Sequence, residues 1–496
     1  MLAELIVLPP FLAAALLAAG IVSGRIAGES SERATSRIAL FAVTLSYLAT
    51  FLAVALKLTS TLPDHIVLGR WLSSGTYRIN LSFSFDALSL TMASLVAVLS
   101  VLVLRFSVNY MHRESGFHRF FLVLSLFVGA MLLLVTAGNA ALTFVGWELA
   151  GVSSYLLIAY AYDRPVAAGN ATRAFVTNRI GDAGFVLGIF LAFFWTGGID
   201  WPTIMAGTAP LPEWQAGLLA CAFLLAATAK SAQVPLAPWL ARAIEGPTPS
   251  SAIFYGAVMV HAGVYLVLRL ESVFDQAPVV MALMAALGLL TAIYGFVCGL
   301  TQTDVKSALI FATLGQVGLM FLEAGLGFWN LALWHLCAHA VFRGYQFLTA
   351  PSLMHQIVGS PARALPERLA RQHGLYLASL QRFWLEELGD RLVVTPIRRL
   401  GGDLQAFDSR IIEKAFGEPT ADDRDVTRAS GLTGRLVWRL ALALHWFEYR
   451  LVLGGLGQEL LDAGRRLGVR LNTVEELLNR PRYLVVFILA TLLTVF

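Results

Sequence analysis

Lysines inside apolar segments are the first candidates for chemistry in this 496-residue chain. Only four residues are lysines, and two of them, Lys230 and Lys306, lie in or at the edge of long apolar runs, within polar motifs. A lysine at mid-bilayer depth costs about 2.5 to 3.5 kcal/mol on insertion scales, so it usually faces a protein interior or a wet cavity. The two lysines therefore predict an ion path. For Lys306, near a helix start, an ammonium that reaches back to the membrane surface is the alternative.

A carboxylate suited to work with Lys230 is Glu148, the only acid between about Phe121 and Tyr162. A buried Glu and Lys can hold or release a proton according to their separation, because each charge favours ionisation of the other. We expect these two residues to pair, and a purely structural ion pair is the alternative.

The helix that carries Lys230 is predicted to break, because Pro235 and Pro238 follow closely and proline removes a backbone donor. A broken helix at membrane depth is tolerated where it lines a cavity or is buried in protein.

Histidines supply the second candidate for proton transfer. His335, His339 and Arg343 are spaced i, i+4 and i+8, so they share one helix face. Histidine titrates near neutral pH, and two stacked histidines beside an arginine form a relay. His261, one helix after the predicted break, is equally compatible with a place in this path and with a core role.

Arg179 and Asp182, three residues apart, are predicted to pair on one helix face in a structural or coupling role.

The elements that position these residues follow from composition. Hydrophobic residues make up 57% of the chain, charged residues 14%, and mean hydropathy is +0.70, which excludes an ordinary soluble domain. We expect an all-α polytopic membrane protein embedded in a lipid bilayer. Apolar runs long enough to cross about 30 Å of hydrocarbon begin near residues 2, 38, 84, 119, 139, 172, 215, 250, 278, 303 and 329.

Arginine placement predicts the orientation. The predicted loops after the first, third and fifth helices carry arginines, whereas the loop near 197–214 carries only acids. By the positive-inside rule the arginine-bearing loops are cytoplasmic, so the N-terminus lies outside. We expect residues 1–350 to be the membrane domain. Half of all charged residues fall in 361–480, which predicts that 351–480 is a cytoplasmic or interfacial amphipathic region, with 481–496 as a membrane-anchoring helix.

Other site types are not predicted. The three cysteines show neither metal-ligand nor disulfide spacing, and no motif suggests a nucleotide loop or a nucleophile with its base. We therefore expect no enzyme site, metal or cofactor in this chain, and no nucleic-acid partner.

Five motifs resemble one family. They are GWELAG (146–151), TNRIGDAGF (177–185), AKSAQVPLAPWL with EGPTPSSA (229–252), TQTDVKSAL with ATLGQVG (301–318) and HLCAHAVFRGYQFL (335–348). Together they resemble the proton-translocating, antiporter-like membrane subunits of respiratory complex I, of Mrp sodium/proton antiporters and of Dab-type inorganic-carbon uptake complexes.

The resemblance implies a role for each matching residue. Glu148 and Lys230 would form the coupled ion pair, Lys306 would be the central lysine, and His335 and His339 would belong to the connecting polar axis. The implied fold is two inverted five-helix repeats, each with a broken helix.

Two departures limit the resemblance. Arg343 stands where complex I members usually have a lysine, and the second broken helix is not found after residue 356, so the second repeat is expected to be incomplete. The chain looks most like the membrane subunit of a Dab-type complex in a bacterial inner membrane. That resemblance implies a peripheral cytoplasmic partner related to zinc carbonic anhydrases, which would hold the zinc.

Three functions follow. The leading hypothesis is a cation-conducting, proton-conducting subunit that energises inorganic-carbon accumulation. The alternatives are a subunit of a redox-driven pump or sodium/proton antiporter, and a membrane scaffold that conducts nothing.

Overall fold

The computed structural model describes residues 2–74, 77–356 and 371–396, with short pieces at 367, 399, 403 and 439–444. The predicted anchor at 481–496 and most of the predicted region 351–480 lie outside these residues. Contacts divide the chain into two compact units, one of Met1–Glu386 with Leu493–Phe496 and the other of Glu387–Leu492. In the second unit the described elements are the end of α18 (Leu385–Gly389) and the π-turn η7 (Asp390–Val394).

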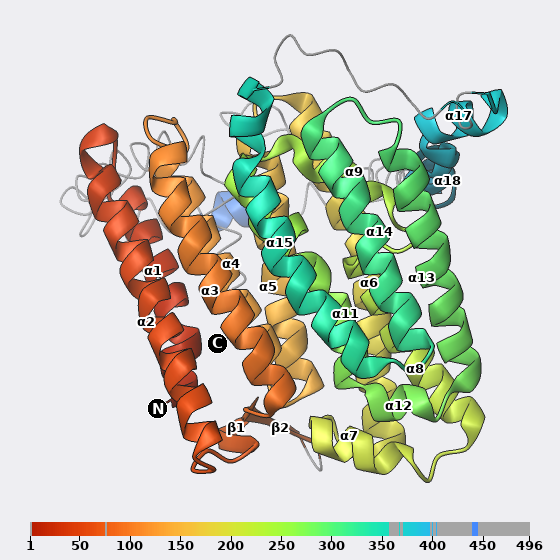
Figure 1. Ribbon diagram of the computed structural model, residues 1–496. Helices are drawn as coiled ribbons and strands as arrows, with labels where there is room; N and C mark the ends of the chain where they lie inside the picture. The colour runs from red at the N-terminus through yellow and green to blue at the C-terminus, as the bar shows by residue number, and fades with distance from the viewer. Residues whose placement is uncertain are drawn as a thin grey trace. The chain divides into compact units, whose positions relative to one another are not determined.

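The first unit is a helical bundle whose crossings match the predicted apolar runs (Figure 1). Within the described residues, nine helical segments are long and apolar enough to cross a membrane. They are α1 (Leu2–Val22), α2 (Glu32–Leu58, preceded by η1, Glu29–Ser31), α3 (Ala87–Tyr110), α4 (Phe117–Thr136), α5 (Ala140–Ile158) continued by η2 (Ala159–Ala161), α6 (Pro165–Thr196), the segment from α10 to α11 (Thr248–Arg269), α13 (Pro278–Gly299) and α14 (Val305–Gly325). Helices α8 (Glu213–Lys230) and α15 (Trp329–Gln356) run among them and account for the remaining two predicted starts.

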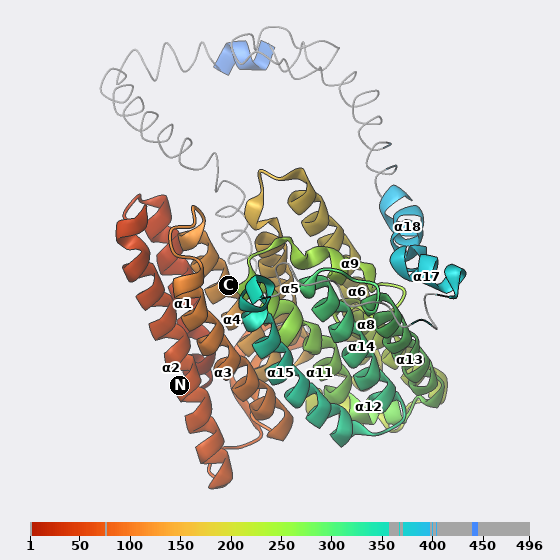
Figure 2. The same cartoon turned by 45° about the horizontal axis from the view of Figure 1, so that its top comes forward.

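The crossing helices at the centre of the bundle are more deeply buried than those at its edges. The crossing segment of α4 is 94% buried and that of Thr248–Arg269 is completely buried, whereas α1 and α13 are each 33% buried. Both views place α1 and α2 at one edge and α13 at the other (Figures 1 and 2). The polar residues of the central helices are therefore shielded from lipid by other helices.

One end of the bundle carries a β-hairpin that the all-helical prediction missed. Strands β1 (His65–Ser74) and β2 (Tyr77–Ser84) pair antiparallel, with His65 opposite Ser84. The short helices α7 (Trp201–Thr208) and α12 (Glu271–Asp275) lie at the same end (Figure 1). The connections after α1, α3 and α5, where the arginines cluster, lie at the opposite end.

The predicted helix break after Lys230 is present. Helix α8 ends at Lys230, Ala232 has φ of 51°, and the short helix α9 (Pro238–Arg242) follows, continued by η3 (Ala243–Glu245). The freed backbone groups are bound by side chains, since Thr291 Oγ1 accepts from the Val234 amide at 2.9 Å. This satisfies polar backbone atoms where no water is expected.

A second break, which the sequence did not predict, interrupts the segment 248–269. Helix α10 (Thr248–Ser251) passes into a π-turn, η4 (Ala252–Ala257), and a 3₁₀ turn, η5 (Met259–His261), before α11 (Ala262–Arg269). A Cβ on Gly263 would lie 2.3 Å from the Ala227 carbonyl oxygen, so only glycine permits this approach of α11 to α8. The two breaks therefore lie against each other.

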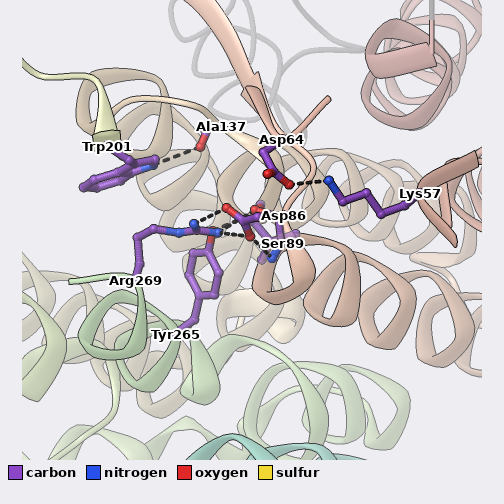
Figure 3. Close-up of polar contacts among 9 residues, drawn as sticks. Lys57, Asp64, Asp86, Ser89, Ala137, Trp201, Tyr265 and Arg269 are labelled. Atoms are coloured by element: carbon purple, nitrogen blue, oxygen red, sulfur yellow. Dashed lines mark hydrogen bonds and ion pairs between the residues drawn. The ribbon is translucent and has the colours of Figure 1, made fainter. Parts of the chain in front are cut away.

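A buried ion pair ties α11 to α3 (Figure 3). Arg269 is 6% exposed, and both of its terminal nitrogens donate to the Asp86 carboxylate, one at 3.0 Å. It also donates to Ser89 Oγ at 2.6 Å and Tyr265 Oη at 3.2 Å. Burial raises the pKa of the Asp86 carboxyl, but the hydrogen bonds and charge of Arg269 outweigh burial and hold that pKa below its ordinary value. This pair fixes the end of the helix that contains the second break.

We expect Arg269→Ala to lower the free energy of unfolding by about 3 kcal/mol, because it leaves the Asp86 charge unpaired. The matched control is Lys57→Ala, which removes the partner of Asp64, a carboxylate whose side chain is 71% exposed (Figure 3). An exposed pair contributes about 0 to 1 kcal/mol. Denaturation of the purified protein in detergent measures both, and equal losses would contradict the structural role of Arg269.

Candidate functional site

The first polar cluster lies between α5, α6 and α8. Glu148 Oε2 accepts a hydrogen bond from Arg179 Nη2, and Arg179 Nε lies 2.9 Å from Asp182 Oδ2. The predicted contact between Arg179 and Asp182 is therefore present. The direct partner of Glu148 is Arg179 and not Lys230 as predicted, because α5 and α6 are neighbours and the long arginine side chain reaches across.

Lys230 is held next to this pair by Trp147. The side chain is buried, its Nζ donates to the Trp147 carbonyl oxygen at 3.1 Å, and it lies 4.8 Å from the centroid of the Trp147 ring. Trp147 Nε1 in turn donates to Asp182 Oδ1 at 2.9 Å. Lys230 is also the last residue of α8, where the helix dipole favours a positive charge.

The side chains of Lys230 and Arg179 both approach α5 at Gly151. A Cβ at Gly151 would lie 3.3 Å from Lys230 Nζ and 3.9 Å from Arg179 Nη2. We call Glu148, Arg179, Asp182 and Lys230 the charge cluster; with all four ionised its net charge is zero. The buried Glu148 Oε1 has no hydrogen-bond partner among the described residues. That oxygen is free to accept a proton or a water molecule.

The interlocked helix breaks lead from the charge cluster to the second polar cluster. Ser231, directly after Lys230, donates from Oγ to the Val260 carbonyl oxygen at 2.6 Å. Val260 directly precedes His261. The ends of the two broken helices therefore place the lysine and the histidine on adjoining backbone.

His261 and His339 form the centre of the second cluster. His261 Nε2 and His339 Nδ1 are 2.9 Å apart, and Arg343 Nε donates to His339 Nε2 at 3.3 Å. Arginine has no acceptor, so His339 Nε2 must be bare in this arrangement. Neutral His339 then carries its proton on Nδ1 and donates to His261 Nε2, which leaves the His261 proton on Nδ1. His261 Nδ1 is buried without a hydrogen-bond partner among the described residues.

His335 makes its hydrogen bonds with residues of α14 and not with the pair of His261 and His339. Its Nδ1 lies 2.9 Å from Glu323 Oε1 and its Nε2 lies 2.8 Å from Gln316 Oε1, both on α14. His335 therefore bridges a carboxyl group and a side-chain amide of the same helix. The ring centroids of His335 and His339 are 6.3 Å apart.

Sequence reasoning missed Glu323 and Gln316. The available signal was that Glu323 is the only acid in the apolar run 305–325. This signal did not identify the contact, because the partner of Glu323, His335, lies on the next helix, α15.

Lys306 lies apart from both clusters. It occupies the first turn of α14, half-buried, beside Asp304, whose Oδ2 accepts from the Ser307 amide at 2.9 Å as the helix N-cap. No hydrogen bond joins Lys306 to either cluster within the described part of the chain.

Known proteins resemble this chain over most of its length. The family described as "NADH:quinone oxidoreductase/Mrp antiporter, TM" matches residues 137–373, and that described as "NADH-Ubiquinone oxidoreductase (complex I), chain 5 N-terminus" matches residues 71–121. NADH-quinone oxidoreductase subunit L of Rhodobacter capsulatus is 39% identical over 466 residues, covering 88% of this chain and 64% of the relative. NAD(P)H-quinone oxidoreductase subunit 5 of Paulinella chromatophora is 36% identical over 74% of this chain and 56% of its own length.

A solved structure agrees with these relatives. The Mrp complex from Dietzia sp. superposes with a TM-score of 0.61 and 27% identity, covering 70% of this chain and 38% of the matched chain. The chain thus spans less than two thirds of each of these three proteins. It is a multi-pass integral membrane protein, and its membrane domain belongs to the antiporter-like family of membrane subunits found in NADH:quinone oxidoreductases and Mrp antiporters.

Proposed function

We propose that this chain conducts protons across a bacterial inner membrane as one subunit of a larger complex. The observation that carries the proposal is the pair of interlocked helix breaks, which joins the charge cluster at Lys230 to the histidine cluster at His261. Broken helices whose freed ends face polar groups are how transporters build ion sites at membrane depth.

The charge cluster is the part of the path that would store a proton. Lys230 can give up a proton only if the surrounding charges rearrange, since a buried charge needs compensation. Glu148 has one free carboxylate oxygen, and Arg179 is shared between Glu148 and Asp182. Movement of the guanidinium from one carboxylate to the other changes the charge next to Lys230, so the proton affinity of Lys230 depends on the arginine's position.

The histidine pair would transmit the proton. In the observed arrangement both unprotonated ring nitrogens are occupied: His261 Nε2 accepts from His339, and His339 Nε2 accepts from Arg343, whose guanidinium stays protonated. A proton can therefore enter the pair only when this 3.3 Å contact opens. Arg343 would therefore act as a valve: proton entry is blocked while it contacts His339 and allowed when it moves away. Its other contact, with Gln346 Oε1 at 2.8 Å, could hold the guanidinium in that second position.

The proposed orientation has the N-terminus outside. This orientation is supported by the connections after α1, α3 and α5, which carry arginines and all lie at the same end of the bundle (Figure 1). Residues 351–480 would then begin on the cytoplasmic side.

The first candidate for the whole complex is a redox-driven pump of the complex I type. It is supported by relatives named as NADH-quinone oxidoreductase subunits, and it corresponds to the alternative and not the leading hypothesis from the sequence. A sodium/proton antiporter of the Mrp type is supported in the same way by the structural likeness.

The second candidate is inorganic-carbon uptake with a partner related to zinc carbonic anhydrases. It is favoured by Arg343 at the position where complex I members usually carry a lysine. A route closed by a fixed charge suits a subunit whose conduction depends on a partner. No zinc is proposed within this chain, and among the described residues no group of three His, Cys, Asp or Glu side chains could hold a metal.

We expect Lys230→Ala and Glu148→Ala each to abolish proton flux while the complex still assembles, because each removes a compensating charge from the cluster. Flux into proteoliposomes, driven by a potassium diffusion potential and read with an internal pH dye, measures this. Lys57→Ala is the control, since Lys57 lies at a helix end and pairs with exposed Asp64. Full flux in both cluster variants would leave only the scaffold hypothesis.

We expect Arg343→Lys to raise proton flux by on the order of tenfold, the effect of lowering a barrier by about 1.4 kcal/mol. A lysine keeps the charge but can release its proton, so His339 Nε2 is no longer blocked. His339→Ala in the Arg343→Lys background should remove the gain. A flux no higher than that of the wild type would refute the valve.

Purification with native partners separates the candidate complexes. Quinone-reducing subunits in the mass spectrum support the first candidate. A zinc-containing soluble protein of the carbonic anhydrase type, released by high salt, supports the second.

A further inference from the structure

The segment 373–386 is fastened to the membrane domain by buried contacts. It consists of α17 (His373–Leu380), the 3₁₀ turn η6 (Arg382–Trp384) and the start of α18. Ser379 is buried, and its Oγ donates to the Val297 carbonyl oxygen at 2.8 Å and contacts Thr301 Oγ1 at 2.9 Å. These contacts hold the segment on the turn between α13 and α14.

The turn η6 has strained backbone. Arg382, Phe383 and Trp384 have φ of 50°, 55° and 52°, in the left-handed region that residues with a Cβ avoid. Such conformations persist where the surroundings fix them. The Phe383 ring lies 6.1 Å from the Tyr294 ring, and the Arg382 guanidinium lies 5.4 Å from the centroid of the Phe311 ring. Neighbouring aromatic side chains thus hold the turn in place.

The turn leads into Glu386, which binds two arginines. Arg242 donates to Glu386 Oε2 from Nη2 and, at 2.9 Å, from Nε, while Arg382 Nη1 donates to Oε1 at 2.8 Å. Burial raises the pKa of the Glu386 carboxyl, but the two guanidiniums outweigh burial and hold that pKa below its ordinary value. Only 11% of this side chain is exposed, so the two arginines and not solvent supply most of its hydrogen bonds.

Arg242 connects this carboxylate to the helix break at Lys230. It is the last residue of α9, and Trp239 in the same short helix donates from Nε1 to the Ala229 carbonyl oxygen at 2.9 Å. Ala229 directly precedes Lys230. A continuous series of contacts therefore runs from Glu386 through α9 to the backbone of the lysine.

We propose that Glu386 is a positioning residue for Lys230, which acts on the ion path through Arg242 and α9. The part about conduction rests on the proposed function. The boundary between the two compact units falls directly after Glu386, the residue that holds α9.

The first test measures the position of the break without requiring conduction. Hydrogen–deuterium exchange of the assembled complex, read by mass spectrometry, should be several-fold faster at amides 231–242 in Glu386→Gln than in the wild type. Exchange in α4 should stay unchanged. Unchanged exchange at 231–242, or faster exchange throughout the bundle, would overturn the proposal, because the latter indicates general destabilisation.

The matched control is Glu367→Gln. Glu367 also pairs with an arginine, Arg371 at 2.9 Å, but both side chains are largely exposed. This variant removes a carboxylate of the same type nearby along the chain, and we expect wild-type exchange and flux. Where Glu386→Gln does not assemble, Glu386→Asp keeps the charge and shortens the side chain, and should show a smaller acceleration confined to the same amides.

The second test measures proton flux in proteoliposomes that contain the whole complex. We expect Glu386→Gln to slow flux about tenfold, the effect of one lost charge-assisted hydrogen bond on the conducting arrangement, with partial recovery in Glu386→Asp. Wild-type flux in Glu386→Gln would refute the link to conduction. A wild-type complex that conducts nothing would instead refute the proposed function, and the exchange experiment would still decide the positioning role.

Discussion

Compensation of buried charge is the constraint on which the rest of this structure depends. An uncompensated ion inside a bundle of apolar helices costs several kcal/mol, so each charge must find its partners within the protein. The charge cluster achieves this with two carboxylates and two cations whose sum is zero. Trp147 completes it, because its carbonyl, ring and indole N–H contact both Lys230 and Asp182. A structure balanced in this way can move a charge only by moving several groups together.

The helix breaks connect the charge cluster to the histidine pair. An unbroken α8 would bury its backbone donors and acceptors in its own hydrogen bonds and would offer polar neighbours only through side chains. By ending at Lys230 and packing against the break at His261, it brings two segments of irregular backbone together, and their free groups bind Ser231, Thr291 and Trp239. Gly263 is required for this approach, because a side chain there would collide with α8. The buried pair of Asp86 and Arg269 then fixes the far end of the second broken helix.

How much the sequence predicted depended on the range of the interaction. Spans follow from local apolar runs, so all eleven predicted starts have a helix, and the break followed from Pro235 and Pro238. Partners across helices do not follow from local pattern, and so Glu148 was assigned to Lys230 when Arg179 lies closer. Glu323 was missed for the same reason. The second break has no proline within its π-turn, and the hairpin 65–84 was missed because one apolar run was traced back to residue 84, before the Asp86 cap.

The two clusters differ in charge, and this difference would give them different roles in the proposed path. The charge cluster holds four ionisable groups within a few ångströms, so a change in the charge of one alters the electrostatic energy of the others. The histidine pair is neutral in the observed arrangement, with one hydrogen bond between the rings and one from Arg343. A proton that entered the pair would be repelled by the guanidinium of Arg343, which contacts His339. In the proposed path, rearrangement of charge near Lys230 would therefore drive transfer, whereas the histidines, which add no fixed charge, would pass the proton on.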